Sequence, residues 1–182
     1  MGGPSDHWSV LVGVDGSSEA RHALEWARDE AALRGGDVLA VHVWVPPAPV
    51  SELAVLASTN EDDLYQKLAR EVLDEAVDDV APASGAPVQI VSEVVRGHAS
   101  TVLLERSADA DLLVVGSRGH GGFTGLLLGS VSQQCVHHAA RPVAVIPAAA
   151  PLPGDGDVVV GVDGSDGSRL ALAWAAEEAA LR

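Results

Sequence analysis

The sequence predicts an α/β protein with a doubly wound, five-stranded parallel sheet and helices on both faces. Short apolar runs alternate along the chain with longer segments whose apolar residues recur at helical spacing. Glycine, proline or aspartate marks most of the boundaries between these segments. Strands that alternate with helices pair in parallel through right-handed crossovers, and this places helices on both sides of one sheet.

Each predicted element has a recognisable start or stop. The first strand closes at Asp15-Gly16, Ser17 suits the N-cap of the next helix, and Gly35-Gly36 suits its end. The prolines from Pro46 onward end the second strand, and Pro82 ends the long helix. We expect strands over residues 8–14, 37–45, 88–95, 111–115 and 143–146 and helices over 17–34, 62–80, 99–107 and 130–140.

The domain organisation follows from an internal repeat. Residues 158–182 match residues 10–34 at a constant offset of 148, and both copies end in Ala-Ala-Leu-Arg. We therefore expect a disordered N-terminus over 1–7, one complete domain over 8–147, a linker over 148–156, and the first strand and helix of a truncated second domain over 157–182. Residues 50–60 carry no clear pattern and are expected to form a mobile loop.

Composition excludes several classes of protein. The formal net charge is −15, and such an acidic surface repels phosphodiester backbones, so no nucleic-acid partner is expected. The single cysteine, Cys135, excludes an internal disulfide and is expected to pack as a small hydrophobic residue. Neither a membrane span nor a signal peptide is visible, so a soluble, cytoplasmic protein with no membrane partner is expected.

The stretch from Gly116 to Ser130 indicates an anion site. The apolar run 112–115 ends at Gly116, and a glycine-rich segment then leads to Gly129-Ser130 at the start of a helix. Backbone N–H groups at a helix N-terminus have no partner inside the helix, and the helix dipole favours negative charge there. We therefore expect this loop to hold nucleotide phosphates, with Asp15 at the end of the first strand holding a ribose. Asp15 is equally well explained as an acid that caps the turn.

Three familiar catalytic or nucleotide templates do not fit. The glycine loop lacks the lysine of a Walker P-loop, and the first strand turn, GVDGSS, lacks the spacing of a dinucleotide fingerprint. A hydrolase triad drawn from Ser130, His120 and Asp15 has no GxSxG elbow to support it. His42, inside the second strand, is expected to be a core histidine with a hydrogen-bonded ring nitrogen.

The segment GSRGHGGFTGLLLGSV resembles the nucleotide loop of the ATP-binding class of universal stress proteins. Gly116, Gly119, Gly129 and Ser130 fill that family's pattern G-x2-G-x9-G-[ST] without a gap. The resemblance covers residues 8–147, with VGVDGS near the start and RPVAVIP at the end. Together with the repeat it resembles the tandem-domain actinobacterial members, apparently truncated in the second domain, and it implies a Rossmann-like, adenine nucleotide alpha-hydrolase-like fold.

The resemblance also implies roles for individual positions. Asp15 would contact the ribose and a Mg²⁺ ion held by the ATP phosphates, and Val43 would meet the adenine through its backbone. Arg118 lies outside the pattern's fixed positions and either offsets phosphate charge or is a solvated loop residue. The positions expected to bind ATP are Gly13, Val14, Asp15, Val43, Val115, Gly116, Arg118, Gly119, Gly129, Ser130 and Val131.

The expected function is that of an ATP-dependent binding module or regulator in a stress response. No general base is recognisable beside the expected γ-phosphate, so hydrolysis should be weak or absent. A slow ATPase or nucleotidyl-type enzyme on the same fold, and a structural dimer that binds no nucleotide, are the alternatives. Residues 142–147, bracketed by Pro142 and Pro147, are expected to form an edge strand and a homodimer contact.

Overall fold

The structure is a computed structural model that describes residues 7–46, 61–80, 87–119, 127–148 and 156–182. The expectations for residues 1–6, for the 50–60 loop and for His120 lie outside these ranges. The chain divides into two compact units, Met1–Ala150 and Pro151–Arg182, and the division falls inside the predicted linker.

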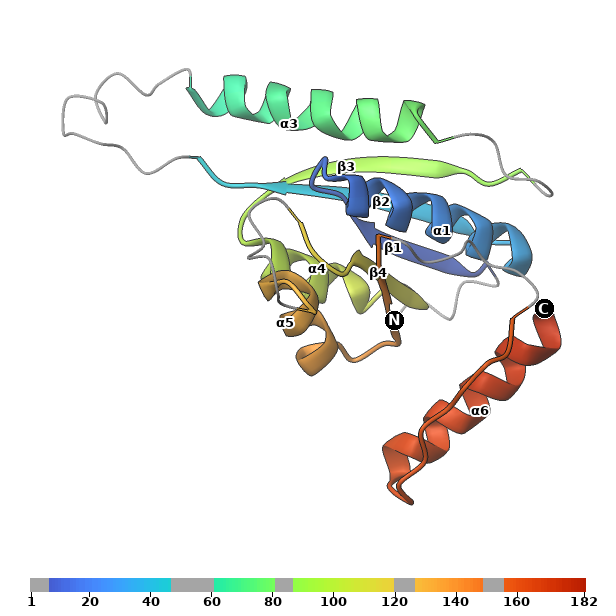
Figure 1. Cartoon of the computed structure of the whole chain (residues 1–182). Helices are drawn as coiled ribbons and strands as arrows, with labels where there is room; N and C mark the ends of the chain where they lie inside the picture. Colours follow the sequence, from blue (N-terminus) through green and yellow to red (C-terminus); the bar gives the residue numbers. More distant parts are fainter. Residues whose placement is uncertain (1–6, 47–60, 81–86, 120–126, 149–155) are drawn as a thin grey trace. The chain divides into compact units, whose positions relative to one another are not determined.

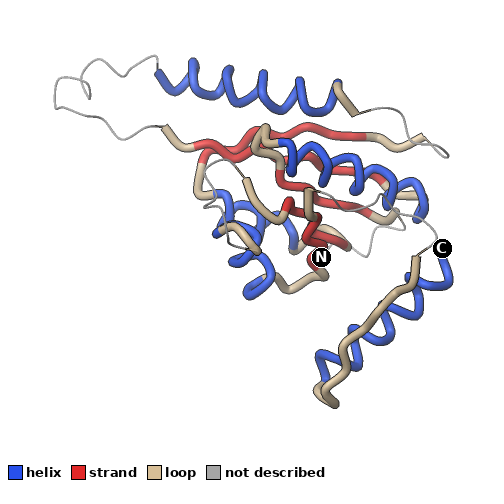
Figure 2. The backbone as a smooth tube through the Cα atoms, in the orientation of Figure 1, coloured by secondary structure: helices blue, strands red, loops and turns tan. Residues whose placement is uncertain are grey.

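A five-stranded sheet forms the centre of the first unit. Its spatial order is β3-β2-β1-β4-β5, and every neighbouring pair is parallel (Figures 1 and 2). β1 therefore lies in the middle, and β5 lies at an edge as its flanking prolines predict. The strands are β1 (Ser9–Gly13), β2 (Asp37–Trp44), β3 (Ile90–Arg96), β4 (Leu112–Gly116) and β5 (Val143–Ile146).

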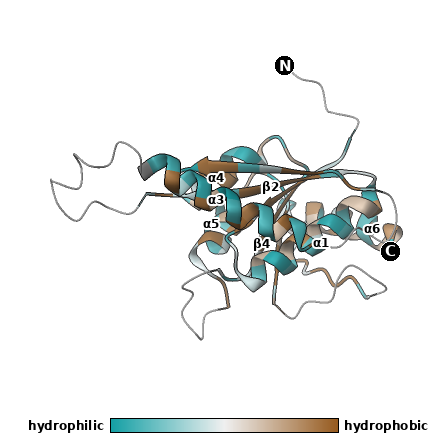
Figure 3. Cartoon of the chain, turned by 90° about the horizontal axis from the view of Figure 1, so that it is seen from above, coloured by the Kyte–Doolittle hydropathy of each residue, from teal (hydrophilic) through white to brown (hydrophobic). Residues whose placement is uncertain are grey.

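Helices cover both faces of the sheet, as predicted. One face packs against α1 (Ser18–Arg34) and α3 (Glu61–Asp78), and the other packs against α4 (Ala99–Ser107) and α5 (Ser130–His138). Two separate apolar cores result because side chains along β1 alternate between the faces. In Figure 3 the strands are mostly brown, or hydrophobic, and the helices carry both hydrophobic and hydrophilic residues.

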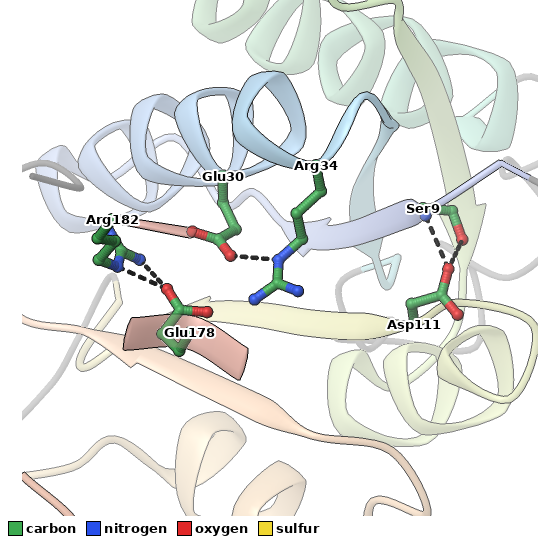
Figure 4. A network of polar contacts seen from close by, with 6 residues as sticks. All are labelled: Ser9, Glu30, Arg34, Asp111, Glu178 and Arg182. Atoms are coloured by element: carbon green, nitrogen blue, oxygen red, sulfur yellow. Dashed lines mark hydrogen bonds and ion pairs between the residues drawn. The ribbon is translucent and has the colours of Figure 1, made fainter. Parts of the chain in front are cut away.

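Local hydrogen bonds fix the element boundaries. Ser17 caps α1 by accepting a hydrogen bond from the Ala20 amide, and Gly35 ends the helix in a left-handed conformation at φ 64°. The Asp111 carboxylate accepts hydrogen bonds from the backbone N–H of Ser9, at 2.8 Å, and from its hydroxyl (Figure 4). This contact holds the start of β4 beside the start of β1. α5 ends at His138, two residues before the predicted end.

The second unit forms the repeated helix but not the repeated strand. α6 (Asp166–Leu181) begins at the N-cap Ser165, and its Glu178–Arg182 ion pair repeats the Glu30–Arg34 pair of α1 (Figure 4). The strand predicted within residues 157–182 is wrong, because residues 156–162 have no strand conformation. A strand is stabilised by a hydrogen-bonded neighbour, and residues 156–182 form no second strand, whereas β1 has a neighbouring strand on each side.

None of the helices in the described part of the chain is both long enough and apolar enough to cross a lipid bilayer.

Candidate functional site

A cavity of about 350 Å³ lies at the carboxyl ends of β1 and β4. From β1 the chain winds outward to β2 and β3, and it then crosses to β4 and β5 on the opposite side. The winding direction therefore reverses between β1 and β4, which is where open α/β sheets bind their ligands. The volume is within the range of small-molecule sites, roughly 300–1,000 Å³.

The structure brings all eleven predicted site residues together around this one cavity. Sequence reasoning missed six further lining residues: Ala20, Val41, Ala99, Leu103, Leu128 and Ser132. A signal for two of them was available, because Ala99 and Leu103 are four residues apart at the start of a helix and so share one face. What the sequence does not show is that this face points to the end of β1.

One side of the cavity is apolar. Leu103 from α4, Val115 from β4 and Val41 from β2 belong to the core beneath the cavity, and Val43 and Val131 pack against it. Gly13 allows α4 to approach, because a Cβ there would lie 2.8 Å from a Leu103 methyl group. This wall suits a flat, apolar ring.

Asp15 has two functions in the geometry of the site. Its Oδ1 accepts hydrogen bonds from the Ser17 backbone N–H, at 3.0 Å, and from the Ser17 hydroxyl, at 2.6 Å. Gly16 completes this turn at φ 85°, a conformation that glycine adopts without strain. The turn-cap interpretation of Asp15 is therefore correct, and the same carboxylate also borders the cavity.

Glycines at the end of β4 and just after it allow the backbone to approach the first turn of α1 closely. A Cβ at Gly119 would lie only 2.1 Å from Oδ2 of Asp15. A Cβ at Gly116 would lie 3.2 Å from the carbonyl oxygen of Glu19, which is closer than side chains normally tolerate. Glycine at these two positions thus places the end of β4 directly against the Asp15 turn.

The N-terminus of α5 faces the same cavity through Ser130, Val131 and Ser132. The N-cap of this helix is Gly129, so no side chain caps the first turn. The Gly129 N–H donates to the carbonyl oxygen of Ser117 at 2.7 Å. The next N–H groups have no acceptor within the helix and carry the positive end of its dipole. This end of the cavity suits an anion.

The polar end of the cavity carries charges of both signs. The Arg118 guanidinium lines the cavity and lies 3.9 Å from the Glu19 carboxylate in the first turn of α1. A hydrogen bond from the Ser18 hydroxyl lowers the pKa of Glu19, the Glu19 backbone adds to this, and Arg118 contributes to a smaller extent. Glu19 is therefore ionised at neutral pH and competes with any bound anion for Arg118.

His42 supports the site from the opposite face of the sheet. Its Nδ1–H donates to the carbonyl oxygen of Val14 at 2.8 Å and so holds the backbone next to Asp15. Burial lowers the pKa of His42, and this outweighs the opposing effects of the Val14 carbonyl and the Asp15 charge. The predicted hydrogen bond of the ring nitrogen is confirmed, but His42 is half-buried and not a residue of the apolar core. Cys135 is fully buried, as predicted, and burial raises the pKa of its thiol.

Among the described residues, no three His, Cys, Asp or Glu side chains gather as metal ligands. Any Mg²⁺ at this site would need ligand oxygens besides those of Asp15. Phosphate oxygens of a bound nucleotide, together with water, are the ligands that Mg²⁺ commonly accepts with one or two carboxylates. The carboxylate at the cavity and the amides at its anion-binding end are compatible with such an arrangement.

Comparison with known proteins gives consistent matches. The universal stress protein family matches residues 9–147. Universal stress protein Rv2623 of Mycobacterium tuberculosis is 38% identical over 178 residues, covering 95% of this chain and 60% of that protein. Universal stress protein Rv2005c of the same organism is 37% identical over 194 residues, covering 100% of this chain and 63% of that protein. The chain thus spans a little over 60% of the length of these curated relatives.

Solved structures share the fold. Universal stress protein UspA from Lactobacillus plantarum matches with a TM-score of 0.63 at 22% identity, covering 78% of this chain and 99% of that one. A universal stress protein in complex with cAMP matches with a TM-score of 0.50 at 24% identity, covering 80% of this chain and 100% of that one. The family match extends from β1 to the end of β5, which is the whole of the sheet that builds the cavity. The chain belongs to the universal stress protein family.

Proposed function

We propose that this chain binds an adenine nucleotide, ATP above all, and acts as a nucleotide-dependent binding module in a stress response. The observation that carries the proposal is the cavity between β1 and β4, which joins an apolar wall to a glycine-lined helix N-terminus. A purine suits the first part and phosphates suit the second. The structural relative in complex with cAMP shows that this fold accommodates an adenine nucleotide in another protein.

Different lining residues would contact the adenine, the ribose and the phosphates of ATP. The adenine would lie against Val43 and Leu103, and the ribose would meet Asp15 at the end of β1. The phosphates would accept hydrogen bonds from the amides of Ser130 and Val131, and Gly119 keeps side-chain bulk away from the Asp15 turn. A Mg²⁺ ion, when bound, would supply positive charge between Asp15 and the phosphates.

The two carboxylates near the anion-binding end favour a regulatory role over rapid ATP hydrolysis. A general base needs an acceptor that is free to take a proton from an attacking water. Asp15 already accepts two hydrogen bonds from Ser17, and Glu19 accepts one from Ser18 and lies near Arg118. Because hydrogen bonds of the α1 turn already hold both carboxylates, we expect hydrolysis to be slow at most and nucleotide occupancy to be the signal that a partner reads.

Calorimetric titration with ATP, ADP, AMP and cAMP, each with and without Mg²⁺, tests the proposal. Asp15→Ala should weaken ATP binding by about tenfold or more, since one charge-assisted contact is worth about 1.5–3 kcal/mol. Asp163→Ala is the matched control, because Asp163 makes the same turn contact with the Ser165 amide, at 2.9 Å, in the second unit. If none of the four nucleotides binds at millimolar concentration, the proposal is wrong. Multiple-turnover release of ADP or AMP that Asp15→Ala abolishes would favour an enzyme.

We also propose that the chain forms a homodimer through residues 142–147. β5 lies at the edge of the sheet, and its outer backbone groups face no further strand among the described residues. Exposed strand edges pair readily with a second chain. Light scattering at micromolar concentration should give the mass of a dimer, and a monomer would contradict this contact.

A further inference from the structure

A buried serine closes the neck of the glycine loop. Ser132, in the first turn of α5, is 2% exposed, and its Oγ lies 2.9 Å from the carbonyl oxygen of Ser117 and 2.9 Å from that of Gly129. The first acceptor lies just beyond β4, and the second is the N-cap of α5. One hydroxyl thus joins the outgoing strand end to the incoming helix.

The Ser132 hydroxyl does not act alone. The Ser117 carbonyl oxygen also accepts the hydrogen bond from the Gly129 N–H at 2.7 Å. The carbonyl oxygen of Ser117 is therefore shared by two donors from the start of α5, and the two ends of the 117–129 segment are held together. Any displacement of α5 away from β4 must break both hydrogen bonds.

The position of this closure relates it to anion recognition. Ser132 itself lines the cavity, beside Ser130 and Val131, whose amides form the anion-binding end. Gly116 and Gly119, on the β4 side of the neck, line the same cavity. The hydrogen bonds at Ser117 therefore hold the α5 N-terminus and the β4 side of the cavity together.

We propose that Ser132 is a positioning residue for the phosphate part of the ligand: its hydroxyl fixes the amides of the α5 N-terminus relative to β4. This inference rests on the proposed nucleotide function and adds to it a residue outside the glycine pattern. Ser132 acts through backbone geometry, so its contribution should appear only for ligands that carry phosphate. The adenine wall, formed by side chains such as Val43 and Leu103, does not depend on it.

The chain contains a matched control for removing a buried helical hydroxyl. Ser107 in α4 is 1% exposed, and its Oγ donates to the carbonyl oxygen of Leu104, three residues earlier, at 2.8 Å. Ser132 has the same three-residue contact with Gly129, but it shares its single hydroxyl proton with the Ser117 carbonyl across the loop. Comparing Ser132→Ala with Ser107→Ala therefore tests whether the contact with Ser117 matters beyond the loss of a buried helical hydroxyl.

Calorimetry with adenosine, AMP and ATP on the full chain tests the inference. Ser132→Ala should weaken ATP and AMP binding about tenfold, as expected for a lost buried hydrogen bond, while adenosine affinity stays unchanged. Ser107→Ala should leave all three affinities unchanged. Equal losses for adenosine and ATP, or equal behaviour of the two variants, would overturn the positioning role.

Amide hydrogen exchange gives a second measurement without any ligand. Ser132→Ala should accelerate exchange of the Gly129 N–H, whose acceptor is the Ser117 carbonyl, and Ser107→Ala should not. Unchanged protection of Gly129 in Ser132→Ala would overturn the inference. Failure of the proposed function looks different, because the wild-type chain would then bind none of the phosphate ligands.

Discussion

Replacing Gly119 with alanine tests the contact between the glycine segment and the Asp15 turn. The added Cβ would lie 2.1 Å from Oδ2 of Asp15, far inside van der Waals contact. Asp15 must then rotate away, and rotation breaks the hydrogen bonds that its Oδ1 accepts from the Ser17 amide and hydroxyl. At about 0.5–1.5 kcal/mol for each hydrogen bond, the expected loss of unfolding free energy is about 1–3 kcal/mol.

The same displacement should weaken nucleotide binding. Asp15 borders the cavity, so its movement away from Gly119 removes one ligand contact. We expect ATP affinity to fall about tenfold, equivalent to about 1.4 kcal/mol. Urea unfolding would measure the first effect, and calorimetric titration would measure the second.

A control and a double-mutant cycle make this reasoning refutable. Gly129→Ala changes another glycine of the same pattern, but its Cβ would meet nothing closer than 3.4 Å, and the φ of −77° suits alanine. It should cost at most about 1 kcal/mol, the usual penalty for alanine at an N-cap. Once Asp15→Ala has removed the carboxylate, Gly119→Ala should cost almost nothing further. An equal cost of Gly119→Ala with and without the Asp15 side chain would show that the two positions do not meet.

Three further predictions concern pH, charge and backbone contact. Burial lowers the pKa of His42 in the folded chain below its ordinary value of 6.5. At pH values between the folded-state pKa and 6.5, the unfolded chain therefore binds more protons than the folded chain. Unfolding free energy should therefore fall as the pH drops below 6.5, and His42→Gln should flatten this slope in urea titrations at several pH values. Arg118→Gln should weaken ATP binding more than adenosine binding. Glu19→Gln should strengthen ATP binding, because the Glu19 carboxylate lies 3.9 Å from Arg118 and competes with the phosphates for it. Calorimetry that finds both variants changing ATP affinity in the same direction would refute this competition. Gly36→Ala should destabilise the fold more than Gly35→Ala, because a Cβ at Gly36 would lie 2.3 Å from the backbone oxygen of Trp8, whereas Gly35→Ala meets open space and costs only the strain of alanine at φ 64°. Thermal unfolding that ranks the two variants the other way would contradict the packing of β1 on β2.

Much of the fold was predictable because the relevant signals are local. Ser17 and Gly35 mark the ends of α1 through capping geometry that involves only neighbouring residues. Apolar runs gave the five strands, and the prolines around β5 indicated an edge position that the sheet order confirms. The eleven site residues lie around one cavity because they come from strand ends and a helix N-terminus, which can be recognised locally in the sequence. In a parallel sheet the carboxyl ends of the strands all lie on the same side, so these residues meet there.

Contacts between distant parts of the chain were decided only by the tertiary structure. Nothing in the sequence near Ala99 or Leu103 shows that α4 completes the cavity, and nothing near Ser132 shows that its hydroxyl reaches Ser117. The sequence left two interpretations of Asp15 open, and the structure places it in a turn and at the cavity together. Residues 156–162 show that a local pattern alone does not determine the structure. Their apolar pattern repeats that of β1, yet they form no strand, because a strand depends on hydrogen-bonded neighbours that a sequence pattern cannot supply.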